Sequence, residues 1–69
     1  MKAIWKNAVE EIRIDREMFH GHDLVGVRIF IQHQSGEWRP SRKGLTLRPD
    51  TWREVIEEVV EILKTEPLS

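Results

Sequence analysis

The sequence predicts an α+β domain in which short strands are followed by a single C-terminal helix. Two periodicities indicate this fold class: apolar residues recur every three or four positions over residues 52–63, as on one side of a helix, and every second position over residues 24–34, as on one face of a strand. The chain has 69 residues and no cysteine, so there is room for one small domain and no disulfide to stabilise it. Since a chain of this length buries only about 60% of its unfolded surface, we expect it to associate with a second copy.

The N-terminal segment gives no clear periodicity. Residues 1–8 are expected to form an N-terminal arm, either mobile or adding apolar contacts through Ile4 and Trp5, ahead of a domain that spans residues 9–66. The segment lacks the apolar centre of a secretory signal, and no apolar run in the chain reaches the roughly 20 residues that cross a membrane. We therefore expect a soluble intracellular protein with no membrane partner, in the cytoplasm or on the nucleoid, or in the nucleus of a eukaryote.

The first two predicted strands cover residues 11–18 and 24–34. In the first, Ile12 and Ile14 alternate with polar residues, and a turn over residues 20–23 follows it. The second has one apolar face and one mixed face. The apolar face carries Val25, Val27, Ile29 and Ile31.

Two further short strands are predicted over residues 37–42 and 45–47, after a turn over residues 34–36. Lys43-Gly44 is expected to break them apart, and Pro40 indicates an edge strand or a bulge. The order of elements is then four strands and one helix.

The C-terminal helix is predicted from six apolar residues on one stripe. Pro49 and Asp50 indicate its start, with Asp50 or Thr51 as the capping residue, and Pro67 indicates its end. The stripe is wider than one small sheet requires, so a partner helix is expected to cover the rest and the stripe is the candidate dimer interface. Its members are Trp52, Val55, Ile56, Val59, Val60 and Leu63.

Charge is segregated along the chain, although the net charge is only -1. Residues 28–53 hold six basic and two acidic residues, a net +4, whereas residues 54–69 hold five acidic residues and one lysine, a net -4. Arg39, Arg42 and Lys43 fall in a segment predicted as strand, which would direct them along one groove, as tracking a phosphate backbone requires. The alternative is a solvated charged hairpin that keeps other chains from pairing with an edge strand.

Residues 39–52 also carry a resemblance to a known family. They contain an Arg-Pro-Ser-Arg-Lys-Gly run and a Pro-Asp-Thr-Trp helix start, and Phe19-x-Gly21 precedes the long strand at a matching distance. This pattern resembles the single-stranded DNA-binding domain of the positive cofactor four family of transcriptional coactivators, over roughly residues 12–64. We expect a compact bacterial or phage member.

The resemblance implies a curved, four-stranded antiparallel sheet and one helix, a dimer formed through the helices, and single-stranded DNA on the concave sheet surface. Carried over position by position, the family's binding residues fall on Phe19, His20, His22, Arg28, Arg39, Arg42 and Lys43. Phe19 could instead be a core or interface aromatic, and Arg28 could form a cross-strand ion pair.

Several positions depart from the family. His20 and His22 replace lysines and are mostly neutral at pH 7, so binding should strengthen as pH falls. Ile31 replaces a base-stacking tryptophan, and Trp38 is the better replacement, ahead of Phe30, although Trp38 could also cover the end of the sheet as a core residue. Ser41 replaces a glycine, which puts the geometry of that turn in question.

The function predicted from these residues is sequence-tolerant single-stranded DNA binding by a homodimer, in transcription regulation or in protection of unpaired DNA. RNA or melted duplex are further candidate ligands, and the transcription machinery a further partner. The alternative is a protein-interaction module of the same fold with no nucleic-acid ligand. No cofactor, metal or enzymatic activity is expected, because there is no cysteine nucleophile or phosphate loop; a metal-dependent enzyme would need Asp23 or His33 to join His20 and His22.

Overall fold

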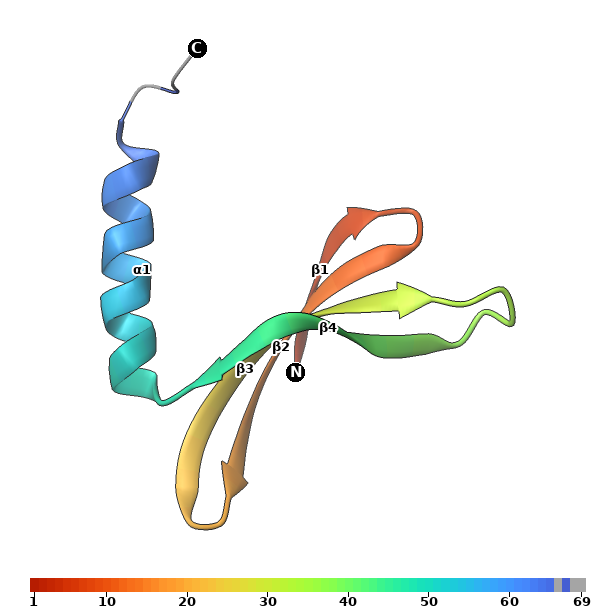
Figure 1. Ribbon diagram of the computed structural model, residues 1–69, viewed down its shortest axis with the longest axis horizontal. Helices are drawn as coiled ribbons and strands as arrows, with labels where there is room; N and C mark the ends of the chain where they lie inside the picture. Colours follow the sequence, from red (N-terminus) through yellow and green to blue (C-terminus); the bar gives the residue numbers. More distant parts are fainter. Residues whose placement is uncertain (66, 68–69) are drawn as a thin grey trace.

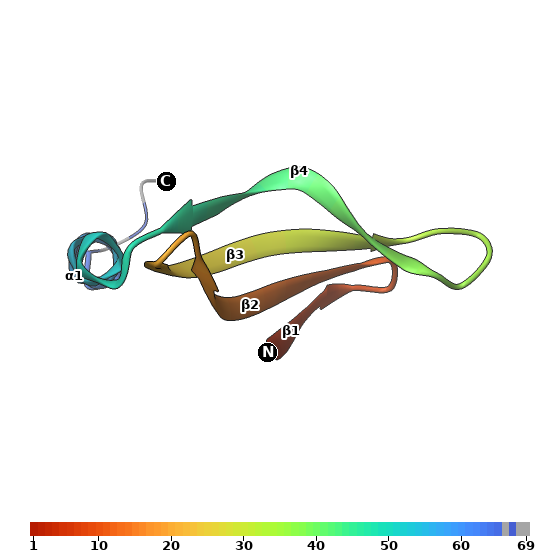
Figure 2. The same cartoon turned by 90° about the horizontal axis from the view of Figure 1, so that it is seen from below.

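The computed structural model describes residues 1–65 and 67, and it confirms the predicted fold class. Four strands form one open antiparallel sheet in the order β1-β2-β3-β4, and a helix follows (Figures 1 and 2). The elements are β1 (Lys2–Asn7), β2 (Glu10–Phe19), β3 (His22–Gln32), β4 (Trp38–Leu47) and α1 (Pro49–Leu63).

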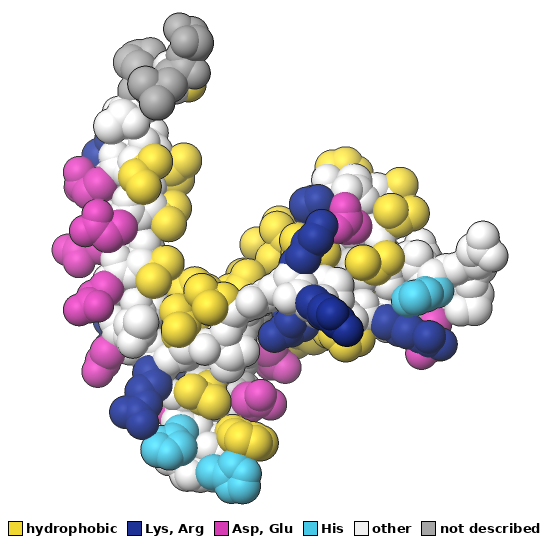
Figure 3. All heavy atoms as spheres, in the orientation of Figure 1, with side chains coloured by type: hydrophobic (Ala, Val, Ile, Leu, Met, Phe, Trp, Pro, Cys, Tyr) yellow, Lys and Arg dark blue, Asp and Glu magenta, His cyan; other side chains and the backbone are white. Residues whose placement is uncertain are grey.

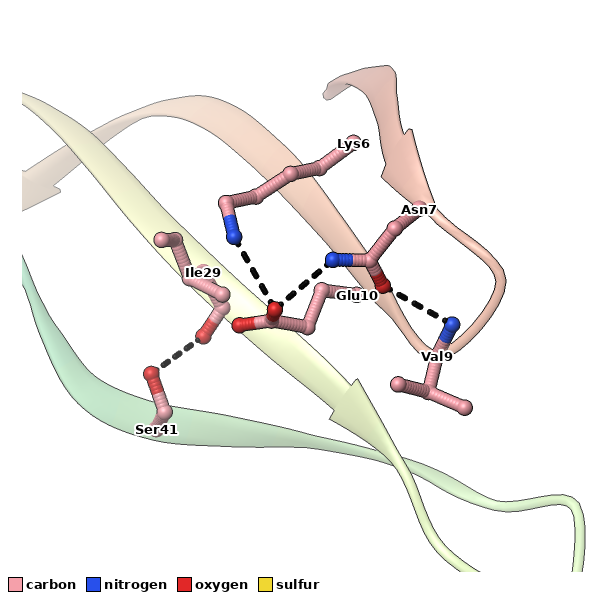
Figure 4. A network of polar contacts seen from close by, with 6 residues as sticks. All are labelled: Lys6, Asn7, Val9, Glu10, Ile29 and Ser41. Carbon is pink, nitrogen blue, oxygen red and sulfur yellow. Dashed lines mark hydrogen bonds and ion pairs between the residues drawn. The ribbon is translucent and has the colours of Figure 1, made fainter.

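The N-terminal segment is a strand and not the expected arm, because the turn that follows it is fastened by side chains. Asn7 Oδ1 accepts a hydrogen bond from the Val9 N–H at 3.0 Å, and Asn7 Nδ2 donates to Glu10 Oε1 at 2.8 Å (Figure 4). Lys6 Nζ donates to the same carboxylate at 2.9 Å. These bonds reverse the chain, so that β1 pairs with β2 from Lys2 onward.

The β2–β3 hairpin closes with the two-residue turn His20-Gly21. Both residues have positive φ, 50° and 78°, which is the backbone of the turn that matches the natural twist of paired strands. Glycine adopts this conformation without strain, and histidine is among the residues that tolerate it. The predicted turn is therefore in place, and it directs the hairpin away from the rest of the sheet (Figure 1).

The expectation of two strands broken at Lys43-Gly44 is wrong, because β4 is one continuous strand with a bulge. Arg28 pairs with Gly44 and Phe30 with Pro40, so residues 41–43 of β4 lie opposite Ile29 alone. The bulge takes up the extra residues, and Pro40 is tolerated because β4 is an edge strand.

Cross-strand pairing divides the sheet into two faces, since paired residues point to the same side. The helix-side face is aliphatic, and its Ile12, Val27 and Leu45 line a recess together with Trp52 of α1. The opposite face, here called the aromatic face, carries four of the five aromatic residues of the chain. They are Trp5, Phe19, Phe30 and Trp38.

The helix begins with Pro49 in its first turn, after Arg48, which makes no side-chain cap. Neither Asp50 nor Thr51 is the capping residue as expected; Asp50 lies inside the first turn, where its carboxylate accepts a hydrogen bond from Arg53 at 2.7 Å. Trp52 joins the helix to the sheet by donating from Nε1 to the Val25 carbonyl at 2.6 Å.

The described part of the chain has no fully buried side chain, polar or apolar. Along α1 the apolar stripe stays open: Ile56 is 55% exposed and Leu63 75%. Figure 3 shows hydrophobic side chains on the side of the helix that faces the sheet and carboxylates on the other. A single copy therefore forms secondary structure but no buried hydrophobic core. Within the described residues no helix has the length and apolar character that spanning a membrane requires.

Candidate nucleic-acid interface

The basic residues of β4 lie along a free edge of the sheet. Arg39 pairs with Ile31 and so points to the helix-side face, where Lys43 lines the recess beside Ile12. Arg42 is exposed within the bulge. Figure 3 shows Lys and Arg side chains gathered over the middle of the sheet. With Arg28 and Trp38, these three residues form what we call the edge group.

Arg28 holds the bulge in place. Its Nη1 donates to the Ser41 carbonyl at 3.0 Å, and its side chain crosses Gly44, which has no side chain to obstruct it. The structure describes this contact in place of the cross-strand ion pair that was the alternative for Arg28. The guanidinium therefore fixes the segment that presents Arg42 and Lys43.

Ser41 also stabilises the bulge, although it replaces the glycine of the family pattern. Its Oγ donates to the Ile29 carbonyl at 2.7 Å (Figure 4) and accepts from the Lys43 N–H at 3.1 Å. A hydroxyl can donate and accept at once, so this side chain joins β3 and β4 where their regular pairing is interrupted.

Trp38 lies on the aromatic face, opposite Gln32 and half-buried. On the same face the Arg13 guanidinium lies 4.1 Å from the centre of the Phe30 ring, a cation–π contact. Arg13 and Trp5 belong to this surface and were not among the predicted site residues, and Phe30 was predicted only as the second choice to replace the stacking tryptophan. The pairing between strands places these residues on one surface, which the alternation of residues within a single strand cannot show.

The remaining predicted residues form a separate tip group at the end of the β2–β3 hairpin. Phe19 is 57% exposed, and its ring packs edge to face against the His20 ring with 4.3 Å between the ring centres. His22 Nδ1 lies 3.2 Å from Arg48 Nη2, which can donate to it. From Arg28 to His22 the strand rises about 20 Å, so one chain does not bring the two groups together.

Carboxylates separate the tip group from the edge group. Asp15 and Glu17 lie between them on the aromatic face and line a shallow recess of about 250 Å³ with Arg28 and Phe30. Negative side chains repel phosphate, so the middle of this hairpin is the least favourable part of the face for a nucleic-acid backbone.

A polar recess of about 380 Å³ lies where the hairpin tip meets the start of α1. Arg16, Arg48 and Arg53 line it together with His22 and Asp23. The Arg16 guanidinium donates hydrogen bonds to Asp23, which lowers the pKa of that carboxyl and raises the pKa of Arg16. Among the described residues no three His, Cys, Asp or Glu side chains are grouped as metal ligands.

Comparison with known proteins gives matches over most of the chain. The family model described as Transcriptional Coactivator p15 (PC4) matches residues 6–58. Crystal structures of a PC4 homologue from Burkholderia pseudomallei are similar in two crystal forms. In the orthorhombic form the TM-score is 0.83 at 26% identity, over 96% of this chain and 89% of that chain. In the tetragonal form the TM-score is 0.82 at 26% identity, over 93% and 94%.

A bacteriophage T5 homologue of the eukaryotic coactivator PC4, implicated in recombination-dependent DNA replication, matches with a TM-score of 0.72 at 23% identity. The match covers 90% of this chain and 75% of that chain, and at this identity it shows the fold alone.

Proposed function

The chain belongs to the Transcriptional Coactivator p15 (PC4) family, and on that basis we propose that it binds single-stranded DNA as a homodimer, with little dependence on base sequence. The observation that carries the proposal is the edge group. Exposed cations lie along a bulged edge strand whose aromatic face carries Trp38, so a strand that wraps this edge would meet cations that track phosphates and an aromatic that stacks on bases, as a single-strand binder requires.

Bulge geometry supports an assignment of roles within the edge group. Arg42 and Lys43 have exposed side chains on a bulge that Arg28 and Ser41 fasten, so the backbone that carries these charges is fixed before any ligand arrives. Preorganised charges lose less entropy on binding than mobile ones. We assign phosphate contacts to Arg39, Arg42 and Lys43, and base stacking to Trp38.

The tip group supports a second contact with the same ligand or with another. Phe19 is exposed at the end of a hairpin that extends from the sheet (Figure 1). Because about 20 Å separates it from the edge group, a bound strand has to be several nucleotides long to reach both, and we propose that Phe19 stacks while His20 and His22 contact phosphates.

The homodimer part of the proposal rests on the open apolar stripe of α1. Ile56, Val59, Val60 and Leu63 are between 43% and 75% exposed, although they are spaced as a buried helix face would be. A second helix laid against them would supply the interior that one chain lacks. Trp52 and Val55 are less exposed, and Trp52 already contacts the sheet of its own chain.

A protein-interaction module is the second candidate, and the carboxylates of the aromatic face favour it. Asp15 and Glu17 would repel phosphate but would attract a basic polypeptide. Transcription regulation or protection of unpaired DNA is the proposed role of the single-strand binder, and neither belongs to a module without a nucleic-acid ligand.

Fluorescence anisotropy with a labelled 20-nucleotide single strand and its duplex tests the proposal. We expect the single strand to bind more tightly, and an Arg42→Ala/Lys43→Ala variant to lose most of the affinity with its oligomeric state unchanged. The matched control is Arg53→Ala/Lys64→Ala, which removes the same charge from helix positions that are already paired with acids. Absence of binding by the unaltered protein at low salt would assign the surface to a polypeptide instead.

A further inference from the structure

Trp5 is a large aromatic side chain that the described residues leave mostly uncovered. Its side chain is 77% exposed, although β1 holds its backbone in regular pairing opposite Glu11. Trp5 also lies just outside residues 6–58, which the family model matches, so family membership assigns it no role. An exposed indole on a fixed strand indicates a contact surface.

The neighbours of Trp5 belong to the aromatic face. Pairing across the sheet places Trp5, Glu11, Phe30 and Pro40 in one row, and Ala3, Arg13, Arg28 and Gly44 in the adjacent row. Ala3 leaves the β1 end of the second row low, and at its other end the Arg28 side chain lies over Gly44. A shallow, aromatic and cationic path therefore runs across the strands from the β4 bulge to the β1 edge.

Charge along this path is nearly balanced at its centre, and Arg28 adds a positive charge toward its β4 end. Glu11 forms an ion pair with Arg13, whose guanidinium also lies over Phe30. The carboxylates Asp15 and Glu17, which form no ion pair with another described residue, lie farther toward the hairpin tip, in the rows beyond Arg13 and Arg28. A polyanion that reaches β1 from the bulge would avoid them by crossing at the level of Trp5 and Phe30.

We propose that Trp5 stacks on an unpaired nucleobase and ends a binding path that crosses the sheet from the β4 bulge. This inference rests on the proposed function and deepens it by naming a residue that distinguishes single strands from duplex. The path crosses three strand spacings and is therefore about 14 Å long. A few nucleotides of a flexible single strand span this distance. Bases inside a duplex are already stacked on one another, so Trp5 contributes to single-strand affinity alone.

Three variants separate stacking from other roles of the indole. Trp5→Ala should weaken binding of a 20-nucleotide single strand roughly 5- to 150-fold, the range for loss of one base stack, with duplex affinity unchanged. Trp5→Phe should restore most of the affinity, because it restores a ring. Trp5→Leu should not, although it retains apolar area.

An oligonucleotide of abasic sites supplies the matched ligand control, because it has phosphates and no bases. On this ligand the unaltered protein and Trp5→Ala should bind equally. If Trp5→Ala binds the normal single strand as tightly as the unaltered protein does, or if it changes the oligomeric state, the stacking role is wrong. The proposed function would survive that result as long as Arg42→Ala/Lys43→Ala still loses most of the affinity.

Photocrosslinking tests the same contact in the unaltered protein. A single strand with 5-iodouracil should form a covalent adduct with the tryptic peptide of residues 3–6, which contains Trp5 as its only aromatic residue. Adducts at Phe19 and Trp38 with none at Trp5 would overturn the inference and leave single-strand binding in place. No adduct and no binding anywhere would remove both.

Discussion

The guanidinium of Arg28 lies directly against Gly44 of the neighbouring strand. A methyl group at Gly44 would come 2.8 Å from Arg28 Cζ and 2.9 Å from Arg28 Nη1, which is closer than van der Waals contact allows. Gly44 is therefore the opening through which Arg28 reaches the Ser41 carbonyl, and these two residues together set the shape of the β4 bulge.

A Gly44→Ala variant should be less stable by about 1–3 kcal/mol, the usual cost of forcing atoms into filled space, and should bind single strands more weakly. Thermal unfolding and anisotropy measure the two effects. Gly26→Ala is the matched control on the same face, since its methyl group would meet only the Thr46 hydroxyl at 3.3 Å. Equal losses in both variants would contradict the role given to the Arg28–Gly44 contact.

Salt dependence should report the number of phosphate contacts. With the three contacts assigned to Arg39, Arg42 and Lys43 in each protomer of a dimer, the slope of log affinity against log salt should be roughly -4 for a single strand. Removing Arg42 and Lys43 from both protomers should lower its magnitude by about 3. A slope near zero would be incompatible with binding through the edge group.

Unfolding should depend on protein concentration, because the stripe of α1 has no cover in one chain. We expect the melting temperature to rise over a hundredfold range of concentration, and Val60→Asp to abolish the cooperative transition, since an unpaired charge in an interface costs ~3–5 kcal/mol. Glu57→Gln, on the charged side of the helix, serves as the control. A melting temperature independent of concentration, with a monomeric mass, would rule out the dimer.

Acid should destabilise the chain partly through Asp23. Hydrogen bonds from Arg16 hold the pKa of Asp23 below its usual value, so the stabilisation is complete above the unfolded-state pKa and is lost as pH falls through the folded-state pKa. Between pH 5 and 3, Asp23→Asn should therefore lose less stability than the unaltered chain in thermal melts. The difference should shrink in high salt, because both side chains are exposed. Parallel pH profiles would contradict this contribution.

The sequence predicts those elements of the fold whose signals are local. The stripe of α1, the alternation in β3 and the turn at His20-Gly21 each depend on neighbouring residues, and the structure has all three. The strand β1 was missed because Trp5 and Ile4 give no clear alternation, and its order comes from the Asn7 turn and from pairing with β2.

The continuity of β4 was missed for a related reason. From the sequence alone, Lys43-Gly44 was predicted to interrupt the strand. In the sheet, the missing side chain of Gly44 leaves the space that the Arg28 side chain occupies. The same limit applies to the candidate site. Residue types predicted the cations of the edge group, but their distribution over two faces, and the place of Trp5 beside Arg13 and Phe30, depend on strand register.

The absence of any fully buried side chain from the described part of the chain has a consequence for dosage in the cell. If chains acquire their interior only on pairing, the concentration of active dimer at low abundance rises with the square of the amount synthesised, by mass action. Halving expression would then leave about a quarter of the dimer. A chain built in this way converts modest changes in its own synthesis into larger changes in occupancy of its ligand.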